Sequence, residues 1–80
     1  MRMVHDNYPS IIHAINTEIG GTEVRVIGIQ KWAMDTRTYW QVAYGHLDDE
    51  ITKAKVLRTE PTLDGAFPTR EILSKLRLLA

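Results

Sequence analysis

The middle of the chain, residues 22–58, contains three stretches rich in β-branched and aromatic residues, separated only by short polar links. The first reads TEVRVIGIQKWAM, the second covers residues 38–44, and the third, ITKAKVLR, covers residues 51–58. This composition is typical of β-strands. Because the links DTR and GHLDDE are short, hairpins are favoured over crossovers, and the three strands are predicted to form an antiparallel meander.

Amphipathic helices are predicted on both sides of this β-rich region. Residues 9–19 begin with Pro9, which suits a first helical position, and end before Gly20-Gly21, which suits a helix terminus. The segment TREILSKLRLLA begins with Thr69, a suitable N-cap, and has Glu71 in its first turn, where the helix dipole favours an acid. Between the third strand and this helix, residues 59–68 form a loop, in which Asp64-Gly65 indicates a turn.

The predicted fold class is therefore α+β, a two-layer helix–three-stranded antiparallel meander–helix (αβββα) with both helices on one sheet face. Eighty residues, 44% of them hydrophobic and 25% charged, fit a single small domain over residues 1–80. The predicted core comprises Ile11, Ile12, Ile15, Ile19, Val24, Val26, Trp40, Val42, Tyr44, Ala54, Val56, Ile72, Leu73, Leu76 and Leu79.

The alternation of side chains along a strand assigns each residue to one of two faces. In the second strand Trp40 shares a face with Val42 and Tyr44, which is larger and more apolar than the face of Tyr39, so Trp40 is predicted to lie inside. In the third strand, Lys53 and Lys55 mark the open face because lysine is rarely fully buried. The predicted open face comprises Arg25, Ile27, Ile29, Lys31, Tyr39, Gln41, Lys53 and Lys55.

Gly28 leaves one alternative open, because a glycine inside a strand can mark a bulge that shifts the phase. Ile27 and Ile29 would then turn inward. In the loop, Leu63 and Phe67 are predicted to pack on the core, whereas Leu78 lies off the helical stripe and is predicted to be exposed.

Chemistry-bearing motifs are absent from the sequence. The serines lack a recognisable base and orienting group, there is no cysteine, and Gly20-Gly21 leads into a strand, not into a phosphate-binding helix. His46, Asp48, Asp49 and Glu50 have no second histidine at ligand spacing and no EF-hand pattern. We therefore expect no enzyme activity, no catalytic residue, no cofactor and no metal site.

Charge and cysteine content limit the classes of partner. Ten basic and ten acidic residues balance, which is unusual for a dedicated nucleic-acid-binding protein. The absence of cysteine fits a reducing compartment, and the sequence contains no apolar run of membrane-spanning length and no signal peptide at its start. We expect a cytoplasmic protein, of a cell or of an infected host, that does not bind a membrane.

The leading functional hypothesis is a small protein-binding module, with contacts from the open face or from the acidic turn of Asp48, Asp49 and Glu50. A homodimer is one form that this binding could take. Small proteins without cysteines or motifs are often accessory products of phages or mobile elements, so an inhibitor or regulator of a host protein, such as a defence-system component, is a further expectation. The alternative is a nucleic-acid-binding domain, in which basic side chains and one ring form a platform; its residues would be Arg25, Lys31, Tyr39, Lys53 and Lys55.

The helix–three strands–helix order resembles that of double-stranded-RNA-binding domains over most of the chain. Those domains carry a lysine cluster at the start of the second helix, which grips phosphates. The corresponding segment here, FPTREILSKL, has Arg70, Glu71 and Lys75 but no such cluster. The resemblance is therefore one of element order alone.

Overall fold

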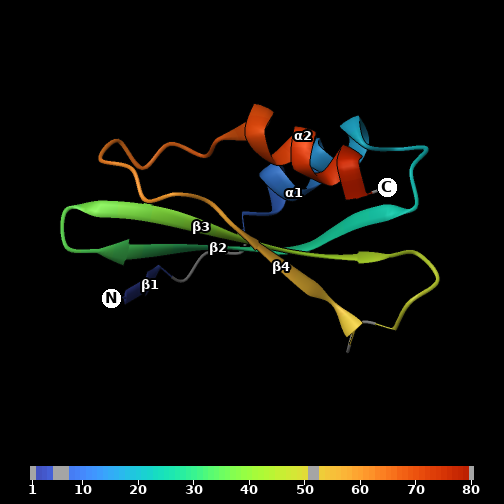
Figure 1. Cartoon of the computed structure of the whole chain (residues 1–80), viewed down its shortest axis with the longest axis horizontal. Helices are drawn as coiled ribbons and strands as arrows, with labels where there is room; N and C mark the ends of the chain where they lie inside the picture. The colour runs from blue at the N-terminus through green and yellow to red at the C-terminus, as the bar shows by residue number, and fades with distance from the viewer. Residues whose placement is uncertain (1, 5–7, 51–52, 80) are drawn as a thin grey trace.

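The computed structural model describes residues 2–4, 8–50 and 53–79. Its elements are β1 (Arg2–Val4), α1 (Pro9–Glu18), β2 (Val24–Met34), β3 (Arg37–His46), β4 (Lys55–Arg58) and α2 (Thr69–Leu79). The strands form one antiparallel sheet in the order β1-β2-β3-β4. Figure 1 shows α1 and α2 together on one face of this sheet, and no helix of the described residues on the other. The predicted α+β architecture is thus confirmed.

Two strands differ from the prediction. β1 was not predicted; it pairs with β2, with Met3 opposite Trp32, and adds a fourth strand to the meander. β4 is shorter than the predicted third strand, because the Lys53 N–H donates to the Glu50 carbonyl at 2.9 Å in a turn, and pairing with β3 begins at Lys55. Residues 51 and 52, where the prediction started this strand, lie outside the described residues.

The helices bury the apolar stripes that the sequence predicted. Ile15 of α1 and Ile72 and Leu76 of α2 are buried, and burial of such a side chain contributes about 1.5–3 kcal/mol. Ile19 is also buried. It is the C-cap of α1, so the helix ends just before Gly20-Gly21, as predicted. Leu79 is a correction to the predicted core, because it lies on the exposed side of the last turn of α2.

Trp40 is buried in the core, as the sequence predicted, and only 4% of its surface is exposed. The rings of Tyr8 and Phe67 meet it edge-on, with centroids 4.9 and 5.1 Å from that of the indole. Its Nε1–H donates to the Gly65 carbonyl at 3.2 Å, which ties the loop before α2 to β3. Phe67 therefore packs on the core as expected, whereas Leu63 is a correction, since it is 73% exposed.

A bulge in β2 confirms the phase shift that Gly28 indicated. Val26 pairs with Tyr44, but Gly28 pairs with Ala43, so one extra residue, Ile27, is accommodated in β2. From Ile29 onward the odd-numbered side chains of β2 face the helices. Ile29 is therefore buried, at 2% exposure, opposite Val42, and its predicted place on the open face was wrong.

The bulge also changes the face on which Lys31 lies. Lys31 pairs with Trp40 and lies on the helix-side face, so its predicted place on the open face was wrong. Its Nζ lies over the indole ring, 5.4 Å from the ring centroid, which is a cation–π arrangement.

The phase predicted for β4 was wrong. Residues opposite each other in adjacent strands share a face, and Leu57 pairs with the buried Val42, whereas Val56 pairs with Ala43 of the open face. Leu57 accordingly packs against the core and Val56 is 54% exposed. Two further corrections follow: Lys55 pairs with Tyr44 and lies on the helix-side face at the sheet edge, and Ala54 is exposed, not part of the core.

Side chains close the edge of β2 in the part that β1 does not reach. The Asn16 side chain of α1 bonds both backbone groups of Val26: its Oδ1 accepts from the N–H at 2.8 Å, and its Nδ2 donates to the carbonyl at 3.0 Å. The Val24 N–H donates to Thr22 Oγ1 at 3.3 Å. The amide of Asn16 thus takes the place of a neighbouring strand at Val26.

Candidate docking surface

The sheet face opposite the helices is the candidate site, and we call it the open face. The register places the outward side chains of three strands on it: Arg25, Ile27, Gln30, Trp32 and Met34 from β2, Arg37, Tyr39, Gln41 and Ala43 from β3, and Val56 and Arg58 from β4. A sheet can leave one face to solvent if that face is polar. Here it also carries two aromatic rings and several exposed aliphatic side chains, which a purely solvated face does not need.

Trp32 and Tyr39 form the aromatic centre of the open face. They are opposite each other in the β2–β3 ladder, and their rings are nearly parallel, at 7°, with centroids 6.3 Å apart. The indole Nε1–H of Trp32 donates to Gln41 Oε1 at 2.7 Å, which fixes the orientation of the ring. Both rings are only half-buried, so they present an ordered apolar surface with little remaining rotamer entropy to lose on binding.

The charged side chains that β2, β3 and β4 place on the open face are all positive. Arg25, Arg37 and Arg58 are exposed there, and β2, β3 and β4 contain no Asp or Glu. The acids nearest along the chain flank these strands: Glu23 directly before β2, Asp35 between β2 and β3, Asp48, Asp49 and Glu50 after β3, and Glu60 after β4. A chain with zero formal net charge therefore has a basic face between acidic turns.

Two hollows mark the open face near the bulge. One, of about 160 Å³, lies over Gly28 and Ala43 and is bounded by Gln30, Gln41 and Val56. The second, of about 290 Å³, lies towards the β3–β4 turn, and its lining includes Ile27, Leu47, Arg25 and Glu50. Both are too shallow to enclose a small molecule, but each could receive a side chain of a docked protein.

The residues predicted for the open face lie in four different places. Arg25, Ile27, Tyr39 and Gln41 lie together on the open face, whereas Ile29 is in the core and Lys31 and Lys55 lie on the helix-side face. Lys53 is exposed in the turn before β4. The sequence reasoning missed further outward residues, which follow from the phase shift in β2, from the longer β3 and from the true phase of β4; among them are Gln30, Trp32, Met34, Arg37, Val56 and Arg58.

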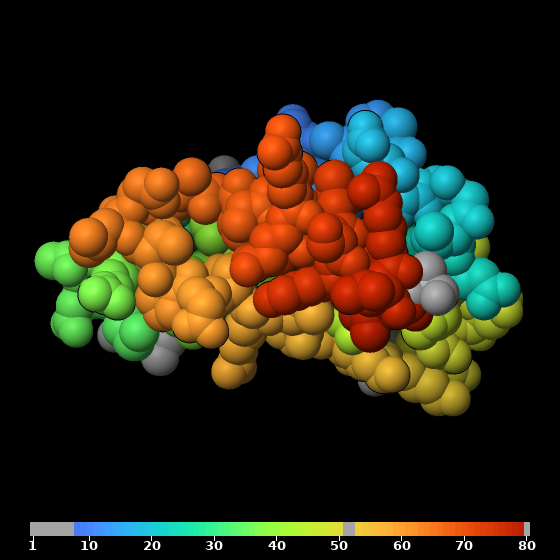
Figure 2. Space-filling model, turned by 45° about the horizontal axis from the view of Figure 1, so that its top comes forward, coloured from blue at the N-terminus to red at the C-terminus, as the bar shows by residue number. Residues whose placement is uncertain are grey.

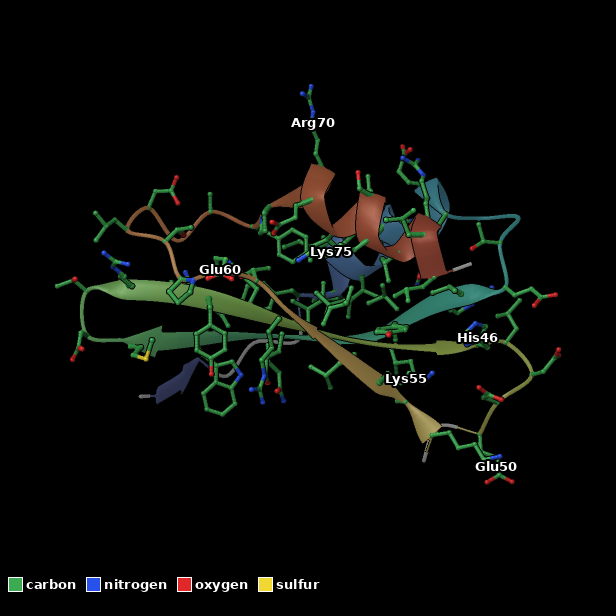
Figure 3. The ribbon with its side chains drawn as sticks, in the orientation of Figure 1. His46, Glu50, Lys55, Glu60, Arg70 and Lys75 are labelled. Carbon is green, nitrogen blue, oxygen red and sulfur yellow. The ribbon has the colours of Figure 1, made fainter. Side chains whose placement is uncertain are left out.

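The acidic turn is a separate feature at the end of the molecule. Figure 3 shows Glu50 at the tip, beyond His46 and Lys55. Asp48, Asp49 and Glu50 are all exposed, and the His46 Nδ1 lies 3.9 Å from Asp49 Oδ2. Within residues 2–4, 8–50 and 53–79, no three His, Cys, Asp or Glu side chains are grouped as a metal site would require.

A wider hollow of about 660 Å³ lies on the other side of the molecule, between α1 and α2. Its apolar lining residues are Ile11, Ala14, Ile15 and Leu73, and its polar ones are exposed residues of the two helices: Ser10, His13, Thr17, Glu18 and Thr69. It has no convergent set of polar groups that would orient a ligand, so we do not assign it a function.

Comparisons with protein families, with characterised proteins and with solved structures find no match to this chain. The helices among the described residues are also too short and too polar for any of them to cross a membrane. The candidate site therefore rests on the geometry and charge of the open face.

Proposed function

We propose that the chain is a small non-enzymatic module that binds a partner protein through its open face. The observation that carries this proposal is the ordered Trp32–Tyr39 pair, near the β2–β3 turn, on a sheet face that no described element covers. Aromatic residues and arginine are the side chains most enriched at the energetic centre of protein interfaces. The open face supplies both, with Arg37 and Arg58 near the rings and Arg25 at the other end of β2.

The aliphatic side chains favour a protein partner over a nucleic acid. Ile27, Met34 and Val56 are exposed on the open face. Ile27 and Met34 lie on β2, before and after Trp32, and Val56 lies on β4. Covering such side chains removes apolar surface from water at about 25 cal/mol per Å², and a complementary protein surface does this better than a phosphate backbone. The arginines would select an acidic partner and speed its association.

Capture from a lysate of the source organism tests this function, with a matched control. We would compare the unmodified protein, a variant with Trp32→Ser and Tyr39→Ser, and a control with Arg70→Ser and Leu78→Ser, all after nuclease treatment. Arg70 and Leu78 are exposed on α2, and Figure 3 shows Arg70 pointing away from the sheet. We expect a stoichiometric partner with the unmodified protein and the control, and its loss with the first variant. Equal capture by all three proteins, or none by the unmodified protein, would contradict the proposal.

A single-stranded nucleic acid is the second candidate, because Arg37 and Arg58 lie near two rings on which bases could stack. Fluorescence anisotropy with labelled dT and U oligomers at two salt concentrations tests it. Binding that falls steeply as salt rises would support this candidate. If no oligomer binds at low salt, the protein-binding function is left as the proposal.

A further inference from the structure

The outer edge of β4 carries backbone groups that no described residue pairs. In an antiparallel ladder, opposite residues alternate between pairs that exchange hydrogen bonds and pairs that do not. The Thr59 N–H donates to the Trp40 carbonyl at 3.0 Å, so Thr59, and with it Leu57 and Lys55, belongs to the first kind. The N–H and C=O groups of Val56 and Arg58 therefore point away from β3, along the sheet edge.

The fold treats this edge differently from the edge of β2. At β2 the outward groups of Val26 are both bonded by Asn16, and the Val24 N–H is bonded by Thr22. Among the described residues, no side chain or backbone bonds the outward groups of Val56 or Arg58. Figure 2 shows the gold atoms of β4 at the lower rim of the molecule, below the red atoms of α2. An exposed strand edge of this kind is a template for an added strand.

The charge along this edge indicates what it would accept. Residues 53–58 read KAKVLR, with Lys53, Lys55 and Arg58 all exposed and no acid among them. Opposite charges on facing strands stabilise the pairing and like charges oppose it. A second copy of β4 would bring the same three cations against them, so the chain's own edge is a poor partner, whereas an extended segment with acidic side chains is complementary.

We propose that β4 adds a strand from the partner protein, and that this segment is extended and acidic. The inference rests on the proposed function and names the part of the partner that the module recognises. The segment would donate to and accept from the outward N–H and C=O groups of Val56 and Arg58. Side chains of the segment opposite these two residues would share the open face with Trp32 and Tyr39, so the strand and the face would form one continuous interface.

Two labelled ten-residue peptides are the probes, one alternating Glu with Val and Thr, the other with Lys in place of Glu. The ¹⁵N-labelled protein is titrated with each, and amide exchange is measured residue by residue. With the acidic peptide we expect slower exchange at the Val56 and Arg58 amides and no change at Leu57, whose N–H already bonds β3. The Lys peptide should bind at least fivefold more weakly.

Two variants of β4 complete the test. Val56→Pro removes an outward N–H that β3 does not use, and prolines are tolerated at such edge positions, so affinity should fall about three- to tenfold. Arg58→Glu reverses the charge and should weaken the acidic peptide about fivefold or more. Arg70→Ser is the control, because Arg70 is exposed on α2 and points away from the sheet, so this variant should bind the acidic peptide as the unmodified protein does. Amide exchange in the unmodified protein keeps the test valid if Val56→Pro does not fold.

The results separate this inference from the proposed function. The inference is overturned if neither peptide slows exchange at Val56 and Arg58, if both bind equally, or if these amides are protected without peptide as protein concentration rises, which would indicate self-association. It is also overturned if a captured partner is retained equally by Arg58→Glu. Failure of the proposed function has a different signature, namely no partner captured, or a partner that the Trp32→Ser, Tyr39→Ser variant retains.

Discussion

Replacement of Asn16 by alanine tests how the fold closes the edge of β2. The side chain makes two hydrogen bonds, at 2.8 and 3.0 Å, to the N–H and C=O of Val26. At about 1 kcal/mol each, their loss costs about 2 kcal/mol, and leaving the partly buried Val26 groups without partners adds up to about 1 kcal/mol. Alanine is the better helix former by about 0.5 kcal/mol, so the net loss of unfolding free energy should be about 2 kcal/mol.

Urea unfolding followed by circular dichroism measures this loss. With a slope of about 1 kcal/mol per M for a small domain, the unfolding midpoint should fall by about 2 M, and the melting temperature by about 10 °C. Thr17→Ala is the matched control, because Thr17 is the next residue of α1, is exposed, and bonds only the His13 carbonyl of its own helix. If Asn16→Ala and Thr17→Ala differ by less than about 0.5 kcal/mol, the Asn16 amide does not act as the neighbour of β2. Amide exchange provides a second readout, since the Val26 N–H should lose its protection in Asn16→Ala alone.

Two further pairs of substitutions test the assignment of side chains to faces by the same unfolding assay. Trp40→Phe removes the bond to Gly65 and part of a buried ring, so the unfolding free energy should fall by about 1.5–3 kcal/mol. Trp32→Phe on the open face should lower it by less than about 1 kcal/mol. Equal losses would contradict the assignment of Trp40 to the core. Leu57→Ala should lower the unfolding free energy by about 1–2 kcal/mol because Leu57 packs on the core. Val56→Ala should change it by less than about 0.5 kcal/mol because Val56 is exposed. A larger loss for Val56→Ala than for Leu57→Ala would contradict the observed phase of β4.

The elements that the sequence predicted well are those with a strong local signal. Pro9 and the glycine pair bound the first helix, and the helical stripe identified Ile15, Ile72 and Leu76. Trp40 could be placed inside because its whole set of alternate residues is larger and more apolar than that of Tyr39. Such signals depend on side-chain period alone, so they survive without knowledge of the neighbouring strands.

The sequence predictions were wrong where the sheet face of a side chain depends on the neighbouring strands. In β4, Val56 and Leu57 are adjacent apolar residues, so alternation alone cannot decide which points inward. The prediction assumed that Lys55 points to the open face, which placed Val56 inside. Lys55 in fact lies on the helix-side face and remains exposed because β4 is at the edge of the sheet. Lys31 also lies on the helix-side face, where its ammonium group is over the Trp40 ring. β1 has only three residues, which is too short for a period to be recognised.

The bulge in β2 determines both the core and the candidate docking surface. Without it, Ile29 would lie on the open face and Trp32 would point towards the helices, so the aromatic pair with Tyr39 would not exist. Gly28 is not required by backbone geometry, since a Cβ there would meet only the Ala43 Cβ at an ordinary 4.0 Å. The bulge is instead imposed by the apolar pattern on its two sides. Val26 opposite Tyr44 and Ile29 opposite Val42 are both buried pairs. Ile29 is three positions after Val26, which is an odd offset, so both side chains can face the helices only if one residue between them is extra. Burial of Ile29 thus provides the free energy that places Trp32 on the open face.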